Sequence, residues 1–225
     1  MSRPVIGWKR VLHEQGVLLG LITLLILLFI LQLAVGRSGY EPFMCVPAEV
    51  TAAWNHLLAG TAGATEAWSL FTLLSCALLH SDIGHLASNL LFLWGFAALV
   101  SELLGWRWML VFFVLAAIGG SITHVALQPD NPIPMLGASG AVSGFMGAYL
   151  GLATRFRLPD PHVWPLARPI PPSHLAFFGG IYIAMDYFAI FGGSTELIAF
   201  GAHVGGFTTG LLMAGLLVPR PASAR

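Results

Sequence analysis

The sequence GASGAVSGFMGAYLG, residues 137–151, places one serine, Ser139, among small residues. Glycines then recur at intervals of four, three and four residues, which puts them along one side of a helix (Gly140, Gly144, Gly147 and Gly151). A helical face without side chains lets another transmembrane helix approach almost backbone to backbone. We therefore expect a helix that begins at about Ser139 and packs closely against a partner.

A second stretch of this kind, GAHVGGFTTG at residues 201–210, carries His203 inside an apolar segment. An ionisable side chain within a membrane span is costly and points to a functional site. A serine and a histidine on close-packing helices suffice for nucleophilic catalysis, because the imidazole can take the hydroxyl proton and return it to the leaving group. The structural alternatives are a helix-capping serine and a histidine hydrogen-bonded to a neighbouring helix.

Composition indicates an all-α, polytopic membrane protein. Hydrophobic residues make up 57% of the 225 residues and charged residues 9%, against about 25% charged in a soluble domain. The formal net charge is zero, so the charge balance predicts no nucleic-acid partner. We expect a single domain over residues 1–225. Six apolar stretches are long enough, or nearly so, to cross a bilayer core of about 30 Å; they cover about 17–35, 84–104, 108–127, 139–154, 173–191 and 198–217.

The first span and the connection after it differ from the rest. Residues 17–35 exceed the apolar core of a signal peptide, about 7–15 residues, so we expect this span to be retained. The long connection 36–83 contains prolines and a half-apolar piece from Trp54 to Leu79, which predicts short interfacial helices rather than a coil. Cys45 and Cys76 lie in this connection, and a disulfide between them stays an open alternative.

The distribution of Lys and Arg predicts the orientation in the membrane. With a cytoplasmic N-terminus, nine basic residues fall on the inner side and only Arg37 falls on the outer side. The nine inner residues are Arg3, Lys9, Arg10, Arg107, Arg155, Arg157, Arg168, Arg220 and Arg225. We expect both termini in the cytoplasm of a bacterium and a site that opens to the outer side of the cytoplasmic membrane.

Counting from the inner charges places Ser139 and His203 at one depth. Ser139 lies 16 residues before Arg155, and His203 lies 17 residues before Arg220. At 1.5 Å per residue both lie about 24–26 Å above the inner edge of the hydrocarbon core. The span 139–154 is shorter than the roughly 20 residues a bilayer requires, so its start should lie within the membrane. Since irregular backbone at that depth must be buried or line an aqueous cavity, we expect a pocket with Ser139 at its floor.

Other polar residues are candidates for supporting roles. His85 and Asn89 share a helical face and, with the Ser139 backbone N–H, can donate hydrogen bonds to a developing oxyanion. A polar pair that only solvates the pocket is the alternative. Asp186 lies nearer mid-span than His203 by about 5–10 Å, so we interpret it as a pocket or structural residue rather than the acid of a triad.

No metal or other cofactor is expected. His80, His85 and His203 are the conceivable ligands, but the sequence has no H-E-x-x-H motif and no carboxylate at ligand spacing. His80 is instead expected to shape the loop before the second span, and His124 to serve packing or solvation.

Taken together, these motifs resemble the rhomboid family of intramembrane serine proteases. The resemblance covers residues from about Trp68 to Leu217. It rests on Gly137, Ala138 and Gly140 around the serine, on AHVGGF at 202–207 with Gly210, on HLASN at 85–89, and on ELLG at 102–105.

The resemblance implies a Ser139–His203 dyad without an acid and an oxyanion hole from His85, Asn89 and the Ser139 backbone. It also implies six transmembrane helices in a rhomboid-like bundle, a fifth span that acts as a lateral gate, and a loop 36–83 partly in the outer leaflet. Two positions depart from the family pattern. A common tryptophan-arginine pair is Trp68-Ser69 here, and an aromatic often found beneath the histidine is replaced by Ser143, so Tyr149 or Phe207 could substitute.

The predicted function is that of an intramembrane serine endopeptidase. Its partners would be transmembrane protein substrates and membrane lipid, with no nucleic acid; the oligomeric state is left open. The alternative is a catalytically silent rhomboid-like protein that binds and sorts membrane helices. Loss of the serine or histidine would mark that class, and both residues are present.

Overall fold

The computed structural model describes residues 8–158, 172–192 and 199–221. Within these residues the ordered structure is helical, and strand-like pairing is limited to an isolated antiparallel bridge between Cys45 and Met135, so the all-α prediction is confirmed. The helices are α1 (Trp8–Val35), α2 (Arg37–Tyr40), η1 (Glu41–Phe43), α3 (Pro47–Leu58), α4 (Ala64–Ser75), η2 (Cys76–Leu78), α5 (Ile83–Leu104), α6 (Trp106–Leu127), α7 (Ser139–Arg155), α8 (Pro172–Phe191) and α9 (Phe200–Leu216).

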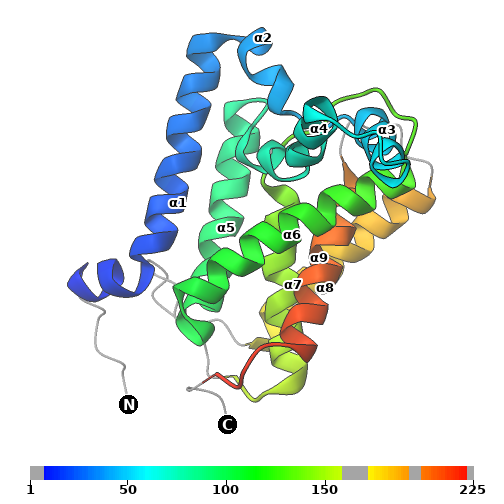
Figure 1. Ribbon diagram of the computed structural model, residues 1–225. Coiled ribbons are helices and arrows are strands. Elements are labelled where there is room, and N and C mark those ends of the chain that lie inside the picture. The colour runs from blue at the N-terminus through cyan, green and yellow to red at the C-terminus, as the bar shows by residue number, and fades with distance from the viewer. Residues whose placement is uncertain (1–7, 159–171, 193–198, 222–225) are drawn as a thin grey trace, which may run out of the picture.

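Helix α7 is the centre of the bundle. It packs against α5, α6, α8 and α9, while α1 lies on the outer side of α5 (Figure 1). Most of its side chains are buried, among them Phe145, Tyr149 and Leu152. Because α7 begins at Ser139, the packing around it also holds that serine in place.

The two predicted glycine faces meet, and they join α7 to α9. A methyl group added at Gly206 would overlap the carbonyl of Gly140, and one added at Gly210 would overlap the carbonyl of Gly144. A methyl group at Gly147 would likewise overlap the carbonyl oxygen of Phe207. The prediction of nearly backbone-to-backbone packing is therefore confirmed.

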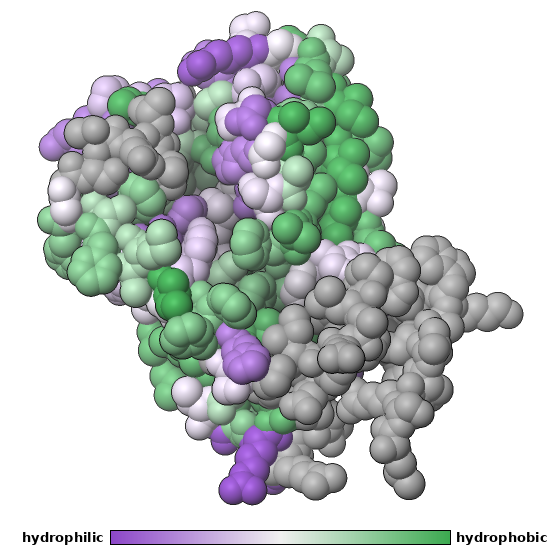
Figure 2. Space-filling view, turned by 180° about the vertical axis from the view of Figure 1, so that it is seen from behind, coloured by the Kyte–Doolittle hydropathy of each residue, from purple (hydrophilic) through white to green (hydrophobic). Residues whose placement is uncertain are grey.

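Among the residues that the structure describes, four helices are long and apolar enough to cross a membrane: Gln15–Val35, Ile83–Leu104, Trp106–Leu127 and Ser173–Phe191. They coincide with four of the six predicted spans and identify an integral membrane protein. The other two predicted spans are helices at the expected places, but α7 and α9 have only 17 residues each. Apolar side chains such as Leu27 and Leu33 remain exposed along α1, and hydrophobic residues cover much of the face in Figure 2.

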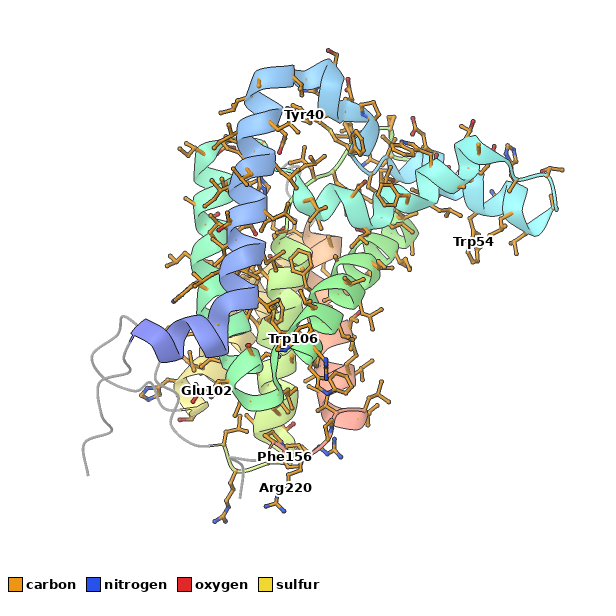
Figure 3. The ribbon with its side chains drawn as sticks, turned by 60° about the vertical axis from the view of Figure 1, so that its left-hand side comes forward. Tyr40, Trp54, Glu102, Trp106, Phe156 and Arg220 are labelled. Carbon is orange, nitrogen blue, oxygen red and sulfur yellow. The ribbon has the colours of Figure 1, made fainter. Side chains whose placement is uncertain are left out.

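The connection between α1 and α5 folds into short helices, as predicted. Helices α3 and α4 form an arm beside the bundle, and Trp54 lies on the part of the arm that stands away from it (Figure 3). The indole N–H of Trp68 donates to the carbonyl of Pro42 over 2.8 Å, and its ring contacts Phe43 edge-on. Trp68 thus anchors the arm without an arginine at the next position.

The charged ends of several helices share one end of the bundle. Glu102 in α5, Phe156 after α7 and Arg220 after α9 lie at that end, and Tyr40 lies at the other (Figure 3). The guanidinium of Arg155 donates to the carbonyl of Val218 over 2.8 Å, which ties the ends of α7 and α9 together. The cytoplasmic side of the bundle stays a prediction.

Candidate active site

Ser139 is the first residue of α7, and a tight turn delivers the chain to it. Gly137 has a φ of +129°, a conformation that favours glycine. Its N–H donates to the carbonyl of Cys76 over 2.9 Å, which holds the turn against η2. The capping position belongs to Ala138, so the interpretation of Ser139 as an N-cap is wrong.

His203 lies at the start of α9 and faces the serine. Its Nε2 atom is 2.9 Å from Ser139 Oγ, within hydrogen-bond distance, although the residues are 64 positions apart. His203 is only 8% exposed, so the contact is shielded from bulk solvent. The two side chains therefore meet as predicted, whereas their depth in the membrane stays a prediction.

The far side of the His203 ring contacts α8. The Nδ1 atom lies 3.0 Å from Asp186 Oδ2 and 3.1 Å from the hydroxyl oxygen of Tyr182. The predicted depth difference between Asp186 and His203 is therefore wrong. Asp186 lies five residues before the end of α8 at Phe191, and His203 three residues after the start of α9. At 1.5 Å per residue these positions differ by about 3 Å, which the side chains bridge.

The aromatic neighbours of His203 also differ from the predicted ones. The ring of Tyr182 lies 5.7 Å from the imidazole at 34°, and Phe200 contacts it edge-on at 6.4 Å. Tyr149 packs instead against Phe96, so Tyr149 does not replace the missing aromatic. Phe207 has no ring contact with His203 among the described residues, and this second suggestion is wrong as well. A tyrosine from α8 takes the place expected for a residue of α7.

The hydroxyl of Ser143 donates to the carbonyl of Ser139 over 2.9 Å and is fully buried. This bond runs within α7 and leaves no ring beneath the histidine. The ring that lies beside His203 comes from Tyr182 of α8 instead.

His85 lies beside the turn that carries Ser139, whereas Asn89 is hydrogen-bonded to the His85 carbonyl. A Cβ atom at Gly137 would lie 2.7 Å from His85 Nε2, so this ring covers the Gly137 backbone. The other ring nitrogen, Nδ1, is 3.0 Å from the hydroxyl of Ser81. Asn89 donates one N–H to the carbonyl of His85 over 2.9 Å and is not hydrogen-bonded to Ser139 within the described residues. The structure thus brings the His85 ring to the serine turn and leaves one N–H of Asn89 outside its bond with the His85 carbonyl.

The loop before α5 depends on a residue that the sequence reasoning missed. Gln32 of α1 donates its amide N–H to the carbonyl of His80 and accepts from the His80 N–H, each over 3.0 Å. A glutamine within an apolar span was the signal that could have revealed it. His80 is 1% exposed, and burial lowers its pKa from 6.5 to about 4. The His80 backbone thus ties this loop to α1, and the role of the His80 side chain stays a prediction.

A small cavity of about 20 Å³ borders Ser139 on the side of η2 and α6. Small residues line much of it, including Ala77, Ala117 and Gly140. A hollow therefore lies beside the serine, and the predicted opening of this pocket to the outer side stays a prediction. Cys76 also lines it, and both Cys76 and Cys45 are free thiols, so the suggested disulfide is absent from this structure.

His124 was expected to serve packing or solvation rather than to bind a metal. His124 is buried in α6 against Gly201 of α9, as expected for a packing residue. Across residues 8–158, 172–192 and 199–221, no three His, Cys, Asp or Glu side chains are grouped so as to hold a metal ion.

A family model described as Rhomboid domain matches residues 64–220. The chain is 33% identical over 129 residues to the Rhomboid protease GluP of Bacillus subtilis, covering 57% of the chain and 23% of that protein. It is 31% identical over 153 residues to the mitochondrial RHOMBOID-like protein 12 of Arabidopsis thaliana, covering 61% and 43%. It is 30% identical over 156 residues to the Rhomboid protease GlpG of Klebsiella pneumoniae, covering 66% and 48%. The chain thus spans less than half the length of these relatives.

Proposed function

The chain belongs to the rhomboid family, and we propose that it is an intramembrane serine endopeptidase that cleaves transmembrane segments of other membrane proteins. The observation that carries this proposal is the 2.9 Å contact between Ser139 Oγ and His203 Nε2. Two relatives, GluP and GlpG, bear the name rhomboid protease, which agrees with it.

In this reaction Ser139 Oγ attacks the carbonyl carbon of the substrate peptide bond. His203 Nε2 accepts the hydroxyl proton and then donates it to the departing amine. Water then hydrolyses the acyl-enzyme, with His203 again as the base. Because the His203 side chain is buried, few water molecules compete for its hydrogen bond with Ser139.

The carbonyl oxygen gains negative charge in the tetrahedral intermediate. Ser139 begins α7, so its backbone N–H has no partner within that helix and faces the positive end of the helix dipole. The His85 ring beside Gly137 is near enough to the turn to donate a second hydrogen bond. Asn89 would contribute through the N–H that does not bond to the His85 carbonyl.

A helical substrate must unwind before its carbonyl can be attacked, because helical carbonyls are hydrogen-bonded and shielded. We assign α8 as the lateral gate, since its outer face carries exposed rings such as Phe177 and Phe188. The cavity lined by alanine and glycine suits a small substrate residue before the cleaved bond.

The proposed topology has six spans, with α7 and α9 crossing in the centre of the bundle. Both termini lie in the cytoplasm, and the connection 36–83 lies on the outer side, partly in the outer leaflet. The bias of nine basic residues to one supports this orientation, and the cytoplasmic membrane of a bacterium is the proposed location.

The test is active-site labelling with a fluorophosphonate, which reacts with an activated serine. The full chain in detergent is compared with Ser139→Ala, His203→Ala and Ser143→Ala. We expect labelling of the wild type and of Ser143→Ala, a matched control one turn further along α7, and none of the first two variants. Absence of labelling in a folded wild type would favour the catalytically silent alternative. Labelling that persists in Ser139→Ala would rule out Ser139 as the nucleophile.

The second arm offers a transmembrane substrate peptide in lipid vesicles. Cleavage within the membrane segment, lost in Ser139→Ala, is the expected result. Binding of the peptide without cleavage by the wild type would contradict the endopeptidase assignment.

A further inference from the structure

Helix α8 places two polar side chains against the same nitrogen of His203. Tyr182 and Asp186 are four residues apart and therefore share one face of the helix. The Asp186 Oδ2 atom lies 3.0 Å from Nδ1, and the Tyr182 hydroxyl lies 3.1 Å from it. The Asp186 and His203 side chains are 8% and 10% exposed, so this contact is almost fully enclosed.

The position of the proton on the imidazole decides whether His203 can act as a base. A neutral imidazole donates from one nitrogen and accepts at the other. To accept the proton of Ser139 at Nε2, the ring must carry its own proton on Nδ1. An ionised carboxylate only accepts hydrogen bonds, so the contact with Asp186 requires that proton on Nδ1. The Tyr182 hydroxyl can donate or accept and therefore favours neither form by itself.

From this geometry we propose that Asp186 is a positioning residue that holds the Nδ1–H tautomer and the orientation of His203, which extends the Ser139–His203 pair to a triad. The Nδ1–H donates to Asp186 Oδ2 throughout. When Nε2 takes the serine proton, the imidazolium forms beside a carboxylate inside the protein. This inference rests on the proposed hydrolytic function.

The burial of Asp186 supports a specific role. A carboxylate removed from water is costly unless a partner compensates it. Within the described residues, the hydrogen bonds of Asp186 lead to His203. The serine and the histidine come from α7 and α9, whereas the acid comes from α8, so three different helices together complete the triad.

The first test is spectroscopic and requires no substrate. Nitrogen NMR of the full chain, labelled with ¹⁵N-histidine, reports which ring nitrogen of His203 carries the proton; His203→Ala assigns the signal. We expect the Nδ1–H form in the wild type and the Nε2–H form in Asp186→Asn, because an asparagine N–H donates to Nδ1. An Nε2–H form in the wild type, or an unchanged Nδ1–H form in Asp186→Asn, overturns the proposal.

The second test is kinetic. We expect Asp186→Asn to lower kcat for a transmembrane peptide by at least about 10²-fold, the lower end of what general-base catalysis contributes. KM should stay within about twofold, since Asp186 touches His203 rather than the substrate. Asp186→Glu should restore part of the rate because it restores the acceptor. A folded Asp186→Asn that keeps kcat within threefold of the wild type overturns the proposal.

Tyr182→Phe and Tyr187→Phe form a matched pair on α8. Tyr187 is exposed and stacks on Phe191, so its hydroxyl should not affect the rate. Tyr182→Phe should lower kcat less than Asp186→Asn does; the reverse order would make the tyrosine the positioning group instead. Should the wild type lack hydrolytic activity, the proposed function fails, and the NMR measurement still decides the role of Asp186.

Discussion

Replacing Gly206 with alanine is expected to push α7 and α9 apart at the candidate active site. The added Cβ atom would lie 2.7 Å from the carbonyl carbon of Gly140, with the carbonyl oxygen closer still. Non-bonded carbon atoms in contact stay about 3.5–4.0 Å apart, so the two backbones must separate by about 1 Å. Gly140 directly follows Ser139, and Gly206 lies three residues after His203, so the separation acts on the pair itself.

The consequence follows from the distance between the two reacting atoms. Ser139 Oγ and His203 Nε2 are 2.9 Å apart; adding about 1 Å takes them beyond the hydrogen-bond range of about 3.2 Å. A misplacement of this size costs about 10²-fold in rate. Overpacking of a close helix contact also costs about 1–3 kcal/mol of stability. Gly206→Ala should therefore lose most activity and unfold at a lower temperature.

The assay combines the rate of fluorophosphonate labelling with thermal unfolding in detergent. Gly215→Ala is the matched control, because it makes the same substitution in the same helix, where an added Cβ meets nothing within 4 Å. The control should label and unfold as the wild type does. If Gly206→Ala also retains the wild-type rate and unfolding temperature, the close packing of α7 on α9 does not position the pair.

Three further predictions concern the loop side of the site. Gly137→Ala should abolish labelling, because its φ of +129° is strained for alanine and the new Cβ would lie 2.6 Å from His85 Cε1; normal labelling would refute this. Burial lowers the pKa of His80 from 6.5 to about 4, so the unfolded chain binds more protons between these values. The free energy of unfolding should thus fall by about 3 kcal/mol as the pH drops from about 6.5 to about 4. A His80→Gln variant that loses as much stability as the wild type over this range would contradict the prediction. The hydrogen bond with Cys76 and burial raise the pKa of the Cys45 thiol, so mass spectrometry should find Cys45 not alkylated at pH 7 until the protein is unfolded; modification of Cys45 in the folded protein would disprove this.

Much of the central packing could be predicted because helical packing is periodic. Glycines spaced by three and four residues fall on one face wherever the helix lies, so the close contact of α7 with α9 follows from local spacing. The similar distance of Ser139 and His203 to the inner charges agrees with their meeting between these helices. The same count along the helix gave a wrong depth for Asp186, because it did not start from Phe191, where α8 ends.

Side-chain partners across different helices could not be predicted in this way. Gln32 bonds to His80 across 48 residues, and neither spacing nor composition selects that pair. Tyr182 fills the place that the family resemblance assigned to an aromatic of α7, where Ser143 stands. Such contacts depend on the rotation and tilt of each helix, which the packing of the whole bundle sets.

The order of residues along the chain was thus enough to define the helices, their small-residue faces and the two side chains that meet between α7 and α9, since each depends on local periodicity. The tertiary fold alone determined that α8 turns Tyr182 and Asp186 toward Nδ1 of His203. The physical reason is that the side of α8 that faces the bundle depends on its fit against α7 and α9, and its apolar sequence is nearly uniform around the helix.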